Sequence, residues 1–119
     1  MGTSNFPIDQ IDELVGQYPG VEQAEEGGIV YFLFPDLEMP AGCAPERVDA
    51  LLCPTARDGY ASRLYLAQQV TGGPSPNWNA TGLRILERNW HAVSWRTREG
   101  LRLAQMVRVH LDAFRTRAA

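Results

Sequence analysis

The sequence predicts a single α+β domain, in which helices cover one antiparallel sheet. Apolar residues recur at helical spacing near the start of the chain and again near its end. Between these segments, short apolar runs alternate with turns that contain glycine and proline. The turns are too short for crossover helices, so neighbouring strands should be antiparallel. We expect residues 1–119 to form this one domain.

Helices are predicted at both ends of the chain. Apolar residues follow a period of 3.6 over residues 8–18, and Pro19 with Gly20 ends the helix. The last helix is predicted over residues 101–114, with arginines facing outward. The opposite face of the first helix carries three acidic residues: Asp9, Asp12 and Glu13.

Four strands are predicted between the helices. Residues 21–26 are acidic and typical of an edge strand, whereas residues 29–34 (IVYFLF) are apolar throughout and indicate a strand buried on both faces. The third and fourth strands are predicted at Arg47–Cys53 and residues 60–70. A breaker cluster at residues 72–76 should begin an irregular segment that crosses to the last helix.

The segment before the last helix concentrates the aromatic residues. Trp90 and Trp95 flank His91 there, and buried aromatics beside a titratable group are typical of a functional site or an interface. His91 has two interpretations: a general base or orienting group, or a structural ring bonded to a backbone carbonyl. Trp78 likewise either contributes to a binding surface or closes the edge of the core.

Charge is distributed unevenly along the 119 residues, although the net charge is only -3. Residues 1–79 carry 11 acidic residues and three arginines, and residues 80–119 carry eight arginines and three acidic residues. This asymmetry indicates either a polarised surface with charged partners or charges that neutralise each other across the fold. Nucleic-acid binding is disfavoured, because the overall balance is acidic and the arginines form no basic stripe.

Two cysteines, Cys43 and Cys53, occur in a chain whose first residues show no signal-peptide pattern. No run approaches the roughly 20 apolar residues of a membrane span. We therefore expect a cytoplasmic protein without a membrane segment, in which a structural disulfide is disfavoured. The chain has no CxxC, HExxH or paired Cys/His spacing, so we expect neither a metal nor a cofactor.

Three blocks resemble a bacterial group related to ubiquitin-conjugating enzymes, which have the UBC (UBC/RWD) fold. They are residues 39–42 (MPAG), residues 49–66 (DALLCPTARDGYASRLYL), and residues 89–91 (NWH) with Trp95. The resemblance implies an N-terminal helix, a four-stranded antiparallel meander, an irregular crossing segment and a C-terminal helix. It also implies operon partners, namely a ubiquitin-activating-like enzyme, a JAB-type peptidase and a ubiquitin-like protein, and a role in antiphage defence.

The chain departs from this family's active members at the positions that carry chemistry. Active members have a His-Pro-Asn triplet and then a nucleophilic cysteine, whereas residues 77–79 (NWN) keep only Asn79 and residues 85–87 (ILE) hold no cysteine. Thioester transfer needs a thiolate and a group that stabilises the oxyanion. We therefore expect a binding or adaptor subunit. The alternative is an active transferase that uses a displaced Cys43 with Asn79 and His91.

Partner-binding residues follow from the same resemblance. Conjugating enzymes use the first helix to dock the activating enzyme, which makes the acidic face of the predicted first helix a candidate docking surface. Asp9, Asp12 and Glu13 would form it. Trp78 and Trp90 are the candidate contacts for a partner at the former active-site groove.

Overall fold

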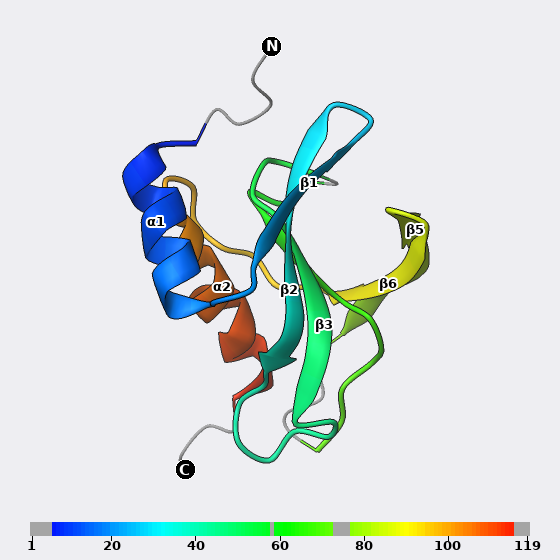
Figure 1. The fold of residues 1–119 in the computed structure, drawn as a ribbon. Coiled ribbons are helices and arrows are strands. Elements are labelled where there is room, and N and C mark those ends of the chain that lie inside the picture. The colour runs from blue at the N-terminus through cyan, green and yellow to red at the C-terminus, as the bar shows by residue number, and fades with distance from the viewer. Residues whose placement is uncertain (1–5, 58, 73–76, 116–119) are drawn as a thin grey trace.

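The computed structural model describes residues 6–57, 59–72 and 77–115, so most of the predicted breaker cluster at 72–76 lies outside the described residues. The described elements follow one another along the chain, with the colours of Figure 1 running from blue to red. They are α1 (Ile8–Gln17), β1 (Glu22–Glu26), β2 (Ile29–Glu38), β3 (Arg47–Cys53), β4 (Arg63–Leu66), β5 (Trp78–Ile85), β6 (Arg88–Val93), α2 (Leu103–Leu111) and the short 3₁₀ helix η1 (Asp112–Phe114).

The described part of the chain forms a six-stranded antiparallel sheet in the order β1-β2-β3-β4-β6-β5. The predicted UBC-like layout with a four-stranded meander is therefore wrong. The segment expected to be irregular contributes the two additional strands as a β5–β6 hairpin. Its turn, Leu86 and Glu87, has φ values of 52° and 63°, the left-handed conformation that a two-residue hairpin turn requires.

One face of the sheet packs against both helices (Figure 1). Side chains alternate between the faces of a strand, so Phe32 and Phe34 of β2 point toward the helices. Leu14 of α1 and Val107 of α2 are fully buried in this first core. The two helices therefore cover a single face of the sheet.

The β5–β6 hairpin covers the opposite face (Figure 1). Tyr31, Leu51 and Tyr65 of the first four strands pack there against Ile85 and Trp90 of the hairpin, forming a second core. Trp90 is 0% exposed, and its indole N–H donates to the Ile85 carbonyl at 2.9 Å. The molecule thus has three layers: the two helices, the part of the sheet formed by β1–β4, and the β5–β6 hairpin at the end of the same sheet.

An aspartate on β3 ties the hairpin to an irregularity in β2. Strand β2 continues through Pro35 by means of a β-bulge, at which Asp36 has a φ of 56°. The Asp36 N–H donates to Asp49 Oδ1 at 2.8 Å, and Asp49 Oδ2 pairs with Arg88 at 2.9 Å. These two hydrogen bonds lower the pKa of the Asp49 carboxyl.

The predicted boundaries of the other elements agree with the structure to different degrees. The third strand was predicted at Arg47–Cys53, and the structure confirms these bounds. The fourth strand is limited to Arg63–Leu66, and the last helix begins at Leu103. At this start the Arg102 N–H donates to Gln105 Oε1 at 3.0 Å and the Leu103 N–H donates to Gln10 Oε1 at 3.1 Å, which satisfies two backbone donors that the helix leaves without an internal partner.

Replacing Trp90 by alanine should destabilise the protein strongly, because it removes the largest side chain of the second core. We expect a loss of about 3–5 kcal/mol in the free energy of unfolding, measured by urea denaturation followed by circular dichroism. Leu83→Ala, at a half-buried position on the same hairpin, should cost roughly 1 kcal/mol. Equal, small losses for both variants would show that the hairpin does not cover a core.

Candidate binding groove

A groove with a volume of about 660 Å³ runs beside β5. Among the described residues its lining includes no acidic side chain. The lining consists of Tyr60, Arg63, Asn79, Ala80, Thr81, Gly82, Leu83, Arg84 and Arg96. Three arginines facing one groove create a positive potential there.

Asn79 connects the polar groups at one end of the groove. Its Oδ1 accepts from the Arg63 guanidinium at 2.6 Å, and its Nδ2 donates to the Tyr60 hydroxyl at 2.8 Å. Arg63 is only 4% exposed and also donates to the Val93 carbonyl at 3.0 Å. Strands β4, β5 and β6 therefore fix this end of the groove through one hydrogen-bonded network.

Two guanidinium groups lie against the ring of Tyr60. The guanidinium carbons of Arg63 and Arg96 are 4.3 Å and 4.9 Å from the ring centroid, within the range of cation–π contacts. The hydrogen bond with Ser94 lowers the pKa of the Tyr60 phenol, and the Asn79 hydrogen bond and both arginine charges act in the same direction. The groove thus favours negative charge at this point.

A buried serine–histidine pair lies beneath the network. The Ser62 hydroxyl is 2.9 Å from His110 Nε2, so the pair has the composition of a nucleophile and its base. However, Ser62 is 2% exposed and His110 4% exposed, which leaves no access for a substrate. Burial, reinforced by the charge of Arg63, lowers the pKa of His110 to about 4. We interpret the pair as a structural link between α2 and the residue that precedes β4.

This link makes stability depend on pH. His110 is neutral in the folded state above about pH 4, whereas in the unfolded chain it binds a proton near pH 6.5. The contribution of neutral His110 to the free energy of unfolding should therefore be fully present above about pH 6.5. It should fall by about 3 kcal/mol as the pH drops to 4. The measurement is the difference in unfolding free energy between the wild type and His110→Gln at several pH values.

The matched control for this measurement is His91→Gln, which replaces the other histidine of the chain. That variant should keep the acid sensitivity of the wild type. A constant difference between wild type and His110→Gln from pH 7 to 4 would contradict the assignment.

The structure separates the three predicted catalytic residues. Asn79 lines the groove. His91 of β6 does not line the groove, but its Nδ1 accepts at 3.3 Å from the N–H of Gly82, which does. Cys43 is 5% exposed in the first core, its Sγ donates to the Phe114 carbonyl at 3.5 Å, and burial raises the pKa of its thiol. Cys53 is 0% exposed in the second core.

The predicted partner-binding tryptophans serve mainly as packing groups. Trp78 is half-buried, with its ring centroid 5.8 Å from that of Phe114. Trp90 is fully buried in the second core, so it offers no surface to a partner in this conformation. Trp95 donates its indole N–H to the Val109 carbonyl at 2.8 Å and fixes the preceding segment to α2.

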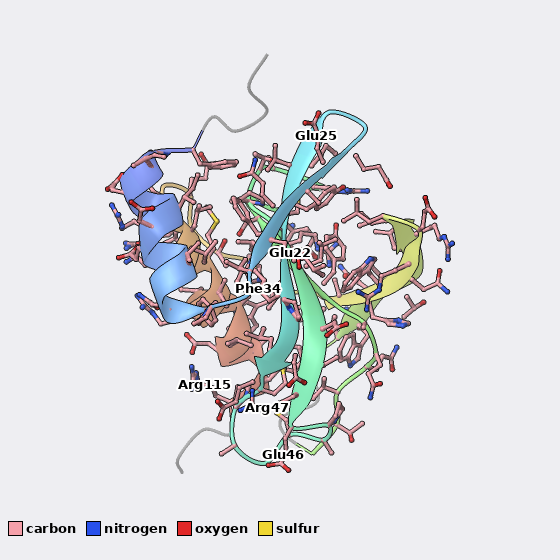
Figure 2. The ribbon with its side chains drawn as sticks, viewed as in Figure 1. Glu22, Glu25, Phe34, Glu46, Arg47 and Arg115 are labelled. Carbon is pink, nitrogen blue, oxygen red and sulfur yellow. The ribbon has the colours of Figure 1, made fainter. Side chains whose placement is uncertain are left out.

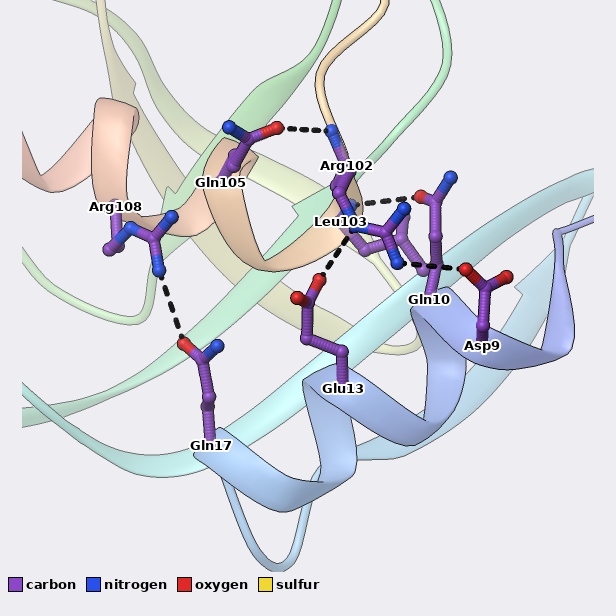
Figure 3. A network of polar contacts seen from close by, with 8 residues as sticks. All are labelled: Asp9, Gln10, Glu13, Gln17, Arg102, Leu103, Gln105 and Arg108. Atoms are coloured by element: carbon purple, nitrogen blue, oxygen red, sulfur yellow. Dashed lines mark hydrogen bonds and ion pairs between the residues drawn. The ribbon is translucent and has the colours of Figure 1, made fainter.

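Two of the three acidic residues of the first helix pair with an arginine of the same molecule (Figure 3). The Arg102 guanidinium donates to Asp9 Oδ2 and to Glu13 Oε1, each at 3.0 Å. The hydrogen bond from Arg102 lowers the pKa of Asp9. Asp12 is exposed. Asp9 and Glu13 thus also join α1 to α2, while their side chains remain 68% and 36% exposed.

A second hollow, of about 490 Å³, lies between the end of α1 and the bulge in β2. Arg47 and Arg115, both labelled in Figure 2, line it together with Asp36 and Glu38. Its lining therefore carries both signs of charge. It holds none of the residues predicted to carry function, so the groove beside β5 is the stronger candidate.

Sequence reasoning missed most of the groove. Tyr60, Arg63, Arg84 and Arg96 were not predicted as site residues. Arg63 was the detectable one, because it precedes three apolar residues in a predicted strand, and a charge in such a place is buried only when partners surround it. Arg84 and Arg96 carry no comparable local signal.

Neither a metal centre nor a membrane span is found in the described part of the chain. No group of three or more His, Cys, Asp or Glu side chains is arranged to hold a metal ion there. No helix among the described residues is long and apolar enough to cross a bilayer.

Comparisons with known proteins leave the family open. No family model matches the chain, and no curated protein and no solved structure matches it.

Proposed function

We propose that the protein is a non-catalytic, protein-binding subunit of a bacterial ubiquitin-like conjugation pathway in the cytoplasm, with a role in antiphage defence. Its partners are a ubiquitin-like protein and a ubiquitin-activating-like enzyme. The three sequence blocks that resemble the bacterial group support the pathway. Because the six-stranded sheet differs from the expected layout, the proposal rests on these blocks and on the groove around Asn79.

The position of the two thiols is the observation that carries the non-catalytic part of the proposal. Transfer through a thioester needs an accessible thiolate. Cys43 and Cys53 are both buried, and neither lines the groove that contains Asn79. The raised pKa of the Cys43 thiol further disfavours its thiolate form. This arrangement favours an adaptor over a transferase that uses Cys43.

A conjugation assay tests this proposal. The protein is incubated with the activating-like enzyme, ATP and the ubiquitin-like protein, and analysed on a non-reducing gel. We expect no reductant-sensitive adduct, because no thiol is accessible, but retention of the ubiquitin-like protein on the immobilised subunit. Cys43→Ala should bind as the wild type does.

Two results would overturn the proposal. An adduct that forms with the wild type and disappears in Cys43→Ala would establish a transferase. Failure of the folded subunit to retain either partner, with no adduct, would remove it from the pathway.

A further inference from the structure

Four exposed arginines carry charge that no acidic side chain of the described residues balances through an ion pair. They are Arg84, Arg96, Arg98 and Arg108. The hydrogen bonds of this group reach neutral acceptors. Arg96 donates to the Gly59 carbonyl at 2.8 Å, and Arg108 donates to Gln17 Oε1 at 3.4 Å. The four positive charges therefore remain available to a ligand.

Folding gathers these four arginines on one surface. Arg84 and Arg96 line the groove beside β5. A second hollow, with a volume of about 420 Å³, is lined by Arg96, Arg98 and Arg108. Arg96 belongs to both, so the two hollows adjoin. As far as the structure describes them, neither lining contains an acidic side chain, although Glu99 directly follows Arg98 in the chain. The potential along both hollows is thus positive.

The chemistry of this surface favours a chain of phosphates over an acidic peptide. A guanidinium binds two phosphate oxygens in parallel, and a nucleic-acid strand carries a phosphate at every nucleotide, so adjoining hollows can each hold one. A peptide draws most of its affinity from buried anchors, and the described lining of the groove has only two aliphatic side chains, Ala80 and Leu83. A single strand can bend into two hollows, whereas duplex DNA, with a persistence length of about 50 nm, is too stiff to do so.

We propose that the two hollows form a binding site for the phosphate backbone of single-stranded nucleic acid. Arg96 lies at the centre of this site. Arg84 extends it along the groove, and Arg98 with Arg108 extends it through the second hollow. Residues 80–119 show no basic stripe along the chain, but the fold assembles one from β5, the segment after β6, and α2. The inference goes beyond the proposed function and does not depend on it.

The salt dependence of binding tests this site without any pathway partner. The probe is a fluorescein-labelled oligothymidine of about twelve nucleotides, followed by fluorescence anisotropy. Each phosphate contact on a single strand contributes about -0.7 to the slope of log affinity against log salt, so four contacts predict a slope of about -2.8. Affinity should therefore fall roughly 50-fold between about 50 and 200 mM salt. Oligoadenosine should give the same slope, because phosphate contacts carry no sequence information.

Matched variants locate the effect on this surface. Arg96→Gln and Arg98→Gln should each weaken binding roughly tenfold at about 50 mM salt and make the slope about 0.7 less steep. The control is Arg47→Gln, which removes the same charge from an exposed arginine that lines the other hollow, between α1 and the β2 bulge. This variant should keep the affinity and slope of the wild type. Circular dichroism confirms that each variant is folded.

Four outcomes would overturn the inference. No binding of oligothymidine at about 50 mM salt would exclude the site, and equal losses in Arg47→Gln and Arg98→Gln would show an effect of net charge alone. Equal affinity for a duplex of the same length would exclude a single-strand site. Displacement of the oligonucleotide by polyglutamate, at the same concentration of negative charge, would assign the surface to an acidic protein partner instead.

Discussion

Burial of both faces of β2 is the constraint on which the rest of the structure depends. Phe32 and Phe34 face the helices, whereas Tyr31 faces the hairpin. Each large apolar side chain left in water would forfeit about 1.5–3 kcal/mol, and Leu51 and Tyr65 of the neighbouring strands extend the second apolar face. A sheet of this composition needs a cover on each side. The helices supply one cover and the β5–β6 hairpin supplies the other.

Burial of both faces of this strand could be predicted from the sequence. Residues 29–34 indicate a strand buried on both faces, and the helices and β3 follow from periodicity and local breakers. The second cover was missed because its turn, Leu86 and Glu87, lacks the asparagine or glycine that usually marks a hairpin. Tertiary burial of Ile85 and Trp90 on both sides of the turn holds these two residues in an unfavourable backbone conformation.

The candidate site was predicted only at Asn79, and the reason is topological. Tyr60, Asn79 and Arg96 come from three separate parts of the chain, and the hairpin brings them together. If residues 77–98 were irregular, as expected, strand β5 would not exist. These three side chains would then share no groove. The positions of Cys43 and Cys53 likewise depend on cores that local patterns do not define. Local patterns therefore singled out Asn79, which lines the groove, but they could not identify the residues that only folding brings beside it.

The way in which the β5–β6 hairpin is held to the rest of the sheet makes its attachment sensitive to temperature. Among the described residues, β6 is joined to β4 by the single register pair Leu66 and His91, so contacts in the second core, more than backbone ladder bonds, hold the hairpin in place. Hydrophobic attraction weakens on cooling, because the hydration of apolar groups has a large heat capacity. Separation of the hairpin from the rest of the sheet, as one unit, should thus become easier as the temperature falls. The groove beside β5 would then open together with the hairpin.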